Sequence, residues 1–274
     1  MLVRGPLHPA LRGVVTMLWS GRSAGEPGAR ERIVPTGQAH LAFRPCGTPI
    51  RLGIDGEQTE TSGVIGGPRT FAHVHDRPSA RSVGVMLAPG ALPMLFGVSA
   101  RALAGRHTGL DALWGRDADR LGEQLHDADD VSALSYVEAV LVARLRPRPP
   151  IPGLPQALEA IGCGAPVHAV AAALGRTPRT LGAWFDEAVG VSPKQWGVLT
   201  RLHRALALAL ADGETDWSVV AHRAGYYDQA HLCRDVRALV GVSPGALRGH
   251  APGAPLHIPV PASDSSKQVS MPAR

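Results

Sequence analysis

The chain has 274 residues, an apolar fraction of 45% and a formal net charge of +5. This length and this apolar content suffice for two domains with buried cores, which excludes a wholly disordered chain. No uncharged apolar run is long enough to span a membrane and the N-terminus lacks the apolar segment of a signal peptide, so we expect a cytoplasmic protein without a membrane partner.

Residues 1 to about 90 contain short apolar runs separated by glycine and proline. Runs of four to six residues with partial two-residue alternation are typical of strands in a small barrel or sandwich. The clearest runs cover residues 32–34, 39–43, 50–54, 70–75 and 82–87. We therefore expect a small β-barrel of cupin-like type at the N-terminal end.

The apolar period changes after residue 90. Segments 91–96, 100–103, 110–114 and 131–145 have helical spacing, so the N-terminal domain is predicted to be α+β. In the last segment four apolar residues recur at intervals of three and four and form one stripe: Leu134, Val137, Leu141 and Leu145. This stripe either packs on the barrel or pairs with a second subunit, so a homodimer is one of two open alternatives.

A proline-rich segment marks the clearest domain boundary. Four of the eight residues 146–153 are proline, which disfavours both helix and sheet and favours an extended linker. We predict a sensory or dimerisation domain over 1–146, a linker over 147–153 and an all-α domain over 154–250. The remaining segment, 251–274, is rich in proline, serine and alanine and is predicted to be a disordered tail.

The all-α domain contains a first helix-turn-helix pattern. Residues 167–174 form a short amphipathic segment, and Gly175 follows at a position where a helix can end. Thr177 and Pro178 are good residues for the start of a second helix, in which Leu181 and Phe185 mark the buried face. A short helix, a tight turn and a second short helix can place the second helix in the major groove of DNA.

The same pattern returns about fifty residues later. Residues 215–224 form a helix, Gly225 turns the chain, and Asp228 begins a helix that runs to Val240. The two units end alike, with VGVSPK over 189–194 and VGVSPG over 240–245. Between them, 193–210 reads as one helix of about 27 Å, which can hold two recognition helices about one DNA turn apart. This internal repeat is the strongest signal in the sequence.

These motifs resemble the DNA-binding domain of the AraC/XylS family of bacterial transcription regulators. The resemblance rests on GYYDQAHLCRDVR over 225–237 and on GVSP over 241–244, and it covers about 95 residues. Residues 32–114 also resemble an uncharacterised N-terminal domain found in some members, although Thr36 and His40 stand where acidic residues are expected. The resemblance implies a transcription factor that binds double-stranded DNA, with a small-molecule effector and RNA polymerase as further partners; whether it is an activator stays open.

Base contacts are expected from the outward positions of the two recognition helices. These are Arg179, Thr180, Gly182 and Ala183 in the first unit, and Gln229, Ala230, His231 and Arg234 in the second. Arg234 can pair with guanine and Gln229 with adenine, whereas the first unit offers only Arg179 as a strong directional donor. We therefore expect specificity to depend more on the second unit. Gly182 suggests either a close approach of the backbone to the groove or recognition of methyl groups and shape.

Phosphate contacts are expected from cations around the recognition helices. The candidates are Arg176, Lys194, Arg201, Arg204 and Arg248. The net charge of residues 154–250 is only +1, from nine basic and eight acidic residues, so local position rather than bulk charge carries this expectation. Arg201 and Arg204 lie on the connecting helix, where intramolecular contacts are an equal alternative.

A possible metal motif occurs in the N-terminal domain. His73 and His75 alternate on a predicted strand after Gly67, as in the cupin motif, and His40 can approach from another strand. The glutamate expected three or four residues later is absent, so we expect no metal, no cofactor and no enzymatic activity. The alternative hypothesis is a cupin-like metal-dependent enzyme fused to a DNA-binding domain.

Overall fold

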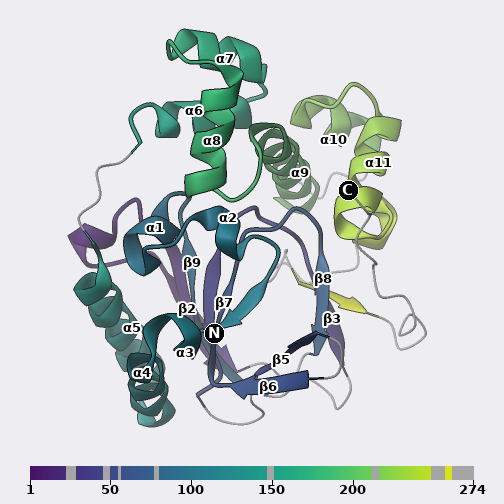
Figure 1. The fold of residues 1–274 in the computed structure, drawn as a ribbon. Coiled ribbons are helices and arrows are strands. Elements are labelled where there is room, and N and C mark those ends of the chain that lie inside the picture. Colours follow the sequence, from purple (N-terminus) through teal and green to yellow (C-terminus); the bar gives the residue numbers. More distant parts are fainter. Residues whose placement is uncertain are drawn as a thin grey trace.

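The computed structural model describes residues 1–22, 29–45, 50–54, 57–76, 80–146, 151–211, 216–247 and 257–260. An N-terminal part built on β-sheets carries helices at one side, and the C-terminal helices lie across its upper end (Figure 1). The predicted α+β class is confirmed. No helix in the described ranges is long and apolar enough to cross a membrane.

The main sheet of the N-terminal part is antiparallel and six-stranded. Its order is β1 (Leu2–Arg4), β2 (Val15–Arg22), β9 (Arg81–Leu87), β4 (His40–Phe43), β7 (Gly63–Gly66) and β10 (His107–Gly109). A second sheet has the order β11 (His257–Val260), β3 (Arg30–Ile33) and β8 (His73–Asp76). A third joins β5 (Ile50–Ile54) to β6 (Glu57–Thr61).

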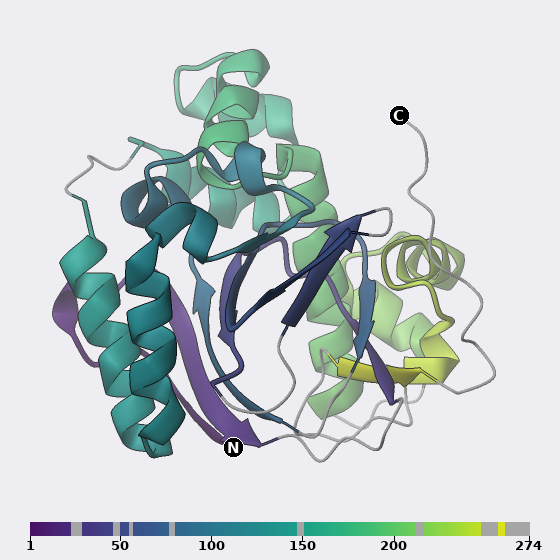
Figure 2. The same cartoon turned by 60° about the horizontal axis from the view of Figure 1, so that its bottom comes forward.

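The closed barrel expected from the sequence is not confirmed. Among the described residues β1 and β10 remain the two edges of an open sheet, and the other strands form two separate smaller sheets. The alternating pattern of a strand predicts which face is buried, but it contains no information on whether the first and last strands pair. Figure 2 shows the strands from another side.

In the described part of the chain five helices of the N-terminal part follow β9, with β10 between the second and the third. They are α1 (Ala91–Phe96), α2 (Ala100–Leu103), α3 (Asp111–Trp114), α4 (Arg116–Asp127) and α5 (Asp130–Arg144). The predicted stripe of α5 packs inside the chain, because Leu134, Val137 and Leu141 are at most 1% exposed and belong to the core formed with the main sheet. Of the two alternatives for this stripe, the structure shows intramolecular packing. The stripe therefore no longer supports a homodimer.

The C-terminal helices enclose two smaller cores. They are α6 (Leu154–Gly162), α7 (Val167–Ala173), α8 (Pro178–Ala188), α9 (Pro193–Ala211), α10 (Trp217–Ala224) and α11 (Gln229–Val240). One core lies between α6, α7 and α8 and includes Trp196 of α9; the other lies between α9, α10 and α11. Helix α9 therefore contributes to both cores, and a short 3-10 helix at Pro244–Leu247 ends the domain.

The second of these cores also contains residues from outside the helical domain. Val34, which follows β3, and Ile258 of β11 are both buried in it beside Leu232 and Val236. The prediction of disorder over 251–274 is thus wrong for 257–260, where the chain pairs with β3. A strand of four residues with one buried isoleucine is too short to be recognised from its sequence pattern, and the strand with which it pairs lies more than 220 positions away.

Candidate nucleic-acid interface

The first helix-turn-helix unit is built as its sequence predicts. Gly175 adopts a positive φ of 62° in the turn, a conformation that glycine adopts without steric cost. The Thr177 side chain caps α8 by accepting a hydrogen bond from the backbone N–H of Thr180 at 3.1 Å. Leu181 and Phe185 are fully buried, which fixes the opposite face of α8 outward.

The second unit repeats this construction with other residues. Asp216 caps α10 through the N–H of Ser218, and Gly225 makes the turn with a φ of 87°. Asp228 then caps α11 by accepting from the N–H of His231 at 2.6 Å. Leu232 is fully buried where Leu181 is buried in the first unit, so the two recognition helices expose corresponding faces.

The predicted base-contacting residues lie on these outward faces. In α8, Arg179 and Ala183 are exposed, whereas Thr180 and Gly182 are partly buried. In α11, Gln229, Ala230 and Arg234 are exposed and His231 is partly buried. The Thr180 hydroxyl lies 3.0 Å from that of Thr177, so in the free protein it already takes part in the cap.

His231 takes part in a small cluster at the base of α11. Its Nε2 lies 3.8 Å from an oxygen of Asp235, and its ring packs edge-on against Tyr226 with 5.1 Å between centroids. Arg201 of α9 joins from the other side, 3.6 Å from Asp235 and with its guanidinium 4.7 Å from the centroid of the Tyr226 ring. Burial raises the pKa of Tyr226 to about 12, so the phenol stays neutral. This cluster joins α9 to α11 and to the turn that precedes α11.

The predicted phosphate contacts divide into two groups. Arg176 and Lys194 are exposed, and the guanidinium of Arg176 lies 5.7 Å from the ring centroid of Trp184. Arg204 instead donates to the carbonyl oxygens of Gly162 at 2.8 Å and of Ala224 at 3.2 Å. Because Arg201 and Arg204 are both engaged within the domain, the structure favours the intramolecular alternative for these two. Arg248 lies outside the described residues.

Two exposed residues near the second recognition helix were not predicted. Tyr227 is 93% exposed in the turn directly before the cap of α11, and Arg237 is exposed three residues after Arg234. A tyrosine hydroxyl can donate to a phosphate oxygen, as can a guanidinium. The sequence did place Tyr227 next to the capping Asp228, in a turn where a large aromatic side chain is not expected to be buried.

The N-terminal part contacts both recognition helices at their C-terminal ends. The N–H of Gly90 donates to the carbonyl of Ala188 in α8, and the N–H of Ala72 donates to the carbonyl of Leu239 in α11, both at 2.7 Å. Ala188 and Leu239 occupy the same position of the repeat, directly before its Val-Gly-Val-Ser-Pro segment. The N-terminal ends of α8 and α11, which carry Arg179 and Gln229, stay exposed.

Further contacts reinforce each of these attachments. Beside α8, Arg101 pairs with Asp186 at 3.3 Å; beside α11, Arg32 donates to the carbonyl of Val240 at 3.2 Å. Between them, the ring of His203 in α9 approaches the carbonyl of Pro35 at 2.8 Å. The N-terminal part therefore touches both units and the helix that joins them.

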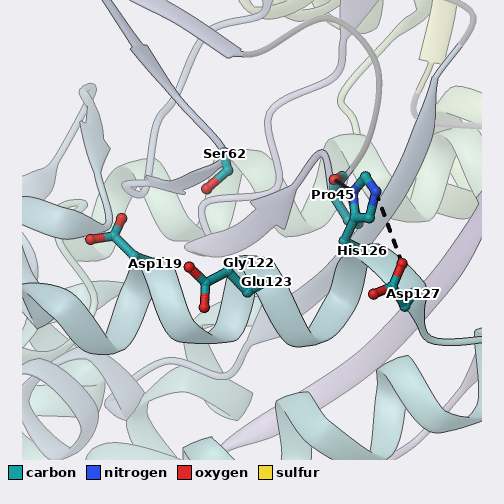
Figure 3. A pocket seen from close by; sticks show the side chains of 7 residues that line it. All are labelled: Pro45, Ser62, Asp119, Gly122, Glu123, His126 and Asp127. Atoms are coloured by element: carbon teal, nitrogen blue, oxygen red, sulfur yellow. Dashed lines mark hydrogen bonds and ion pairs between the residues drawn. The ribbon is translucent and has the colours of Figure 1, made fainter.

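Two surface depressions are candidates for small molecules. One of about 710 Å³ lies between the two parts of the chain and is lined by Arg101 and Arg106 on one side and by Ser192 and Gln195 on the other. The other, of about 440 Å³, lies beside α4, where Asp119, Glu123 and Asp127 follow one another along the helix and Ser62 lies opposite (Figure 3). The three carboxylates of the second disfavour an anionic ligand there.

The histidines of the predicted metal motif do not form one site. His73 lies beside His107, with 5.0 Å between ring centroids, and His40 lies 6.0 Å from His107 on the other side. Burial, together with the charge of Arg69, lowers the pKa of His40 to about 4 and that of His107 to about 3, so these imidazoles are neutral. The ring of His75 stacks on that of His73 with 5.8 Å between centroids, and His75 also contacts Glu31, which in turn contacts His257.

Comparisons with known proteins match two separate segments of the chain. A family described as a helix-turn-helix domain matches residues 170–250, and a domain of unknown function, DUF6597, matches residues 6–109. No curated protein matches the chain. Among solved structures, ToxT from Vibrio cholerae O395 is similar at 10% identity and a TM-score of 0.44, over 85% of this chain and 96% of that one. Wild-type ToxT from Vibrio cholerae strain SCE256 with bound unsaturated fatty acid is similar at 10% identity and a TM-score of 0.45, over 84% and 92%.

Proposed function

The chain is a DNA-binding transcription regulator with an AraC-type helix-turn-helix domain, and from this premise we propose that both of its units read DNA while the N-terminal domain controls their placement. The observation that carries the proposal is the matched attachment of the N-terminal domain to Ala188 and Leu239. The effector is a small molecule bound by the N-terminal domain, in the cytoplasm.

The DNA-binding face consists of the exposed N-terminal halves of α8 and α11. In helix-turn-helix proteins the first residues of the recognition helix contact the base edges. Arg179 in α8, and Gln229 and Arg234 in α11, are exposed there, and all three side chains can form paired hydrogen bonds with bases. Arg176 and Lys194 are exposed beside α8 and would contact phosphates, which fix orientation but not sequence. Tyr227 and Arg237 would do the same beside α11.

The second unit would contribute more to specificity than the first. Its exposed face offers Gln229 and Arg234, whereas in α8 Thr180 is held by its own cap and Gly182 has no side chain. Apolar or absent side chains can recognise thymine methyl groups and groove shape but discriminate less between bases. A base-substitution scan of the DNA site should show fewer tolerated changes opposite Arg234 than opposite Arg179.

Control by the N-terminal domain follows from where it contacts the helices. An effector changes DNA affinity only if it binds two arrangements of the protein with different affinity. Ala72, which contacts α11, lies directly before β8, and Gly90, which contacts α8, lies just after β9. A movement of one of these segments relative to the other would therefore change the spacing of the recognition helices. The depression lined by Arg101 and Arg106 lies at the α8 attachment, where an anionic effector would meet Arg106 and compete with Asp186 for Arg101.

The proposal is tested by binding to DNA upstream of the chain's own gene, in excess unrelated DNA and across a salt series. Arg234→Ala should weaken specific binding about 5- to 100-fold, the value of one good base contact, and leave nonspecific binding nearly unchanged. Arg116→Ala is the matched control, because Arg116 is an exposed arginine on α4, outside the helical domain. Equal binding by wild type and Arg234→Ala, or binding that unrelated DNA removes completely, would refute the proposed DNA face.

A further inference from the structure

Three residues from distant parts of the chain meet on one face of the small sheet. In that sheet β3 is central, and Glu31 pairs directly with His75 of β8. On the other side His257 of β11 pairs with Ile33, which shares a strand face with Glu31 because side chains alternate along a strand. Glu31 is therefore flanked by one imidazole from each neighbouring strand. In Figure 1 the ribbons of β3 and β8 are labelled, and β11 is the yellow strand.

The distances between these groups suit a metal ion. His75 Nε2 lies 3.0 Å and His257 Nδ1 lies 3.2 Å from the same oxygen, Oε1 of Glu31, and all three atoms lie within 4.8 Å of one another. Ligands bound to Zn²⁺ at about 2.0–2.2 Å in a tetrahedron are about 3.3–3.6 Å apart. Small side-chain movements would thus bring all three atoms to bonding distance of one ion.

We propose that Glu31, His75 and His257 form a binding site for a divalent first-row transition metal ion, of which Zn²⁺ is the working example. A donor set of two imidazole nitrogens and one carboxylate oxygen favours such ions over Mg²⁺ and Ca²⁺, which bind mainly oxygen ligands. The carboxylate forms the floor of the site, since the Glu31 side chain is 11% exposed. The histidines form its rim, at 35% and 47% exposed, so an ion can enter and water can complete its coordination.

The contacts among the three groups favour the same assignment. His75 and His257 each direct a ring nitrogen at the same carboxylate oxygen of Glu31, so the three donor atoms already converge. A metal ion would take the place of the protons that lie between these atoms.

The site explains why the sequence argued against a metal. The cupin-like pattern offered His40, His73 and His75 and lacked a carboxylate near them in sequence. In the structure His40 and His73 lie with His107, and only His75 belongs to the new site. The missing carboxylate comes from β3, and the further histidine comes from the C-terminal segment.

A bound ion would fix strand β11 in place. His257 is the first residue of this strand, and the next residue, Ile258, is buried in the core of the second helix-turn-helix unit. The ion would bond a short strand to β3 and β8 at the point where the N-terminal domain meets that unit. The site itself does not depend on the chain binding DNA.

The test is metal titration of the untagged, full-length protein after treatment with a chelator. Zn²⁺ binding is followed by calorimetry, and Co²⁺ binding by the visible absorption that a low-symmetry site with nitrogen and oxygen ligands produces. We expect one equivalent of ion, and a rise in the Tm of the protein on addition of Zn²⁺. His257→Ala should weaken binding at least ~10-fold, and it should abolish the Co²⁺ absorption and the rise in Tm.

Two further variants complete the design. His75→Ala should behave as His257→Ala does, while His168→Ala, which removes an exposed histidine of α7, should bind as the wild type does. His257→Ala changes an exposed side chain at the end of the chain's last described strand, so its folding can be checked by circular dichroism. Absence of stoichiometric binding, or wild-type binding by folded His257→Ala, would overturn the proposal.

Discussion

Arg204 offers the sharpest test of how the helical domain is held together. Its guanidinium donates to the carbonyl of Gly162 in α6 and to that of Ala224, the last residue of α10. Both carbonyls lie in the last turns of their helices, where carbonyl groups lack a partner inside the helix and a cation is favoured. Arg204 itself lies on α9, so a single side chain joins α6 of the first core and α10 of the second core to the connecting helix.

The expected loss of stability follows from these two hydrogen bonds. A hydrogen bond to a charged group contributes about 1.5–3 kcal/mol. Both bonds of Arg204 are only partly buried, and water can reach the carbonyls once the guanidinium is gone, so we take the lower end for each. Arg204→Met, which keeps most of the apolar stem, should then lower the free energy of unfolding by about 3 kcal/mol. That is a large share of the 5–15 kcal/mol typical of a domain.

The assay separates this role from a phosphate contact. Urea unfolding gives the change in stability, and the salt dependence of DNA binding counts the phosphate contacts. Arg204→Met should unfold earlier but keep the wild-type salt slope, whereas Lys194→Met should keep its stability and reduce the slope by about 1. Wild-type stability of Arg204→Met together with a reduced slope would refute the intramolecular role.

Three further predictions concern the recognition helix, the interface and pH. Gly182→Ala should stabilise α8 by about 0.5–1 kcal/mol, because no atom lies within 4 Å of the added Cβ; weaker DNA binding despite this gain would indicate close approach of the backbone to DNA, and a lower Tm would contradict the reasoning. Gly190→Ala should loosen the α8 attachment, since its Cβ would lie 2.9 Å from the carbonyl oxygen of Ala100 at a φ of +80°; limited proteolysis should then cut faster between the domains, and an unchanged rate would argue against a tight contact. As the pH is lowered from 6.5 to about 4, the free energy of unfolding should fall by about 1.4 kcal/mol per pH unit for each of His40 and His107. The reason is that these histidines bind protons in the unfolded chain but not in the folded chain. A free energy of unfolding that urea titrations find constant over this range would contradict their neutral state.

The helical domain was predictable because its signals are local. Thr177 and Asp228 cap their helices as expected, and Gly175 and Gly225 turn the chain where the sequence placed the turns. Capping and turn chemistry depend on residues within four positions of one another, so a sequence pattern records them completely. Because the two units share the same order of signals, the prediction of each unit supported the prediction of the other.

The N-terminal domain was predicted less completely for physical reasons. Strand β2 was missed because its sequence, VTMLWSGR, does not alternate cleanly, and α4 was missed because most of its residues are charged or polar. The buried residues of α4 are Ala118, Leu121, Gly122 and Leu125, of which only the two leucines are large and apolar. Contacts that join distant segments, such as that of Glu31 with His257, leave no local pattern at all.

The equal attachment of Ala188 and Leu239 has a consequence for the operator. Each base pair inserted between two half-sites moves them about 3.4 Å apart and rotates one about 35° around the DNA axis relative to the other. A protein with independent recognition helices on a flexible linker would follow such an insertion. Here both helices are attached at their C-terminal ends to the N-terminal part and are joined by α9, so following an inserted base pair would strain the 2.7 Å backbone hydrogen bond at one end or the other. We therefore expect operator length, in single base pairs, to affect how tightly the chain binds DNA.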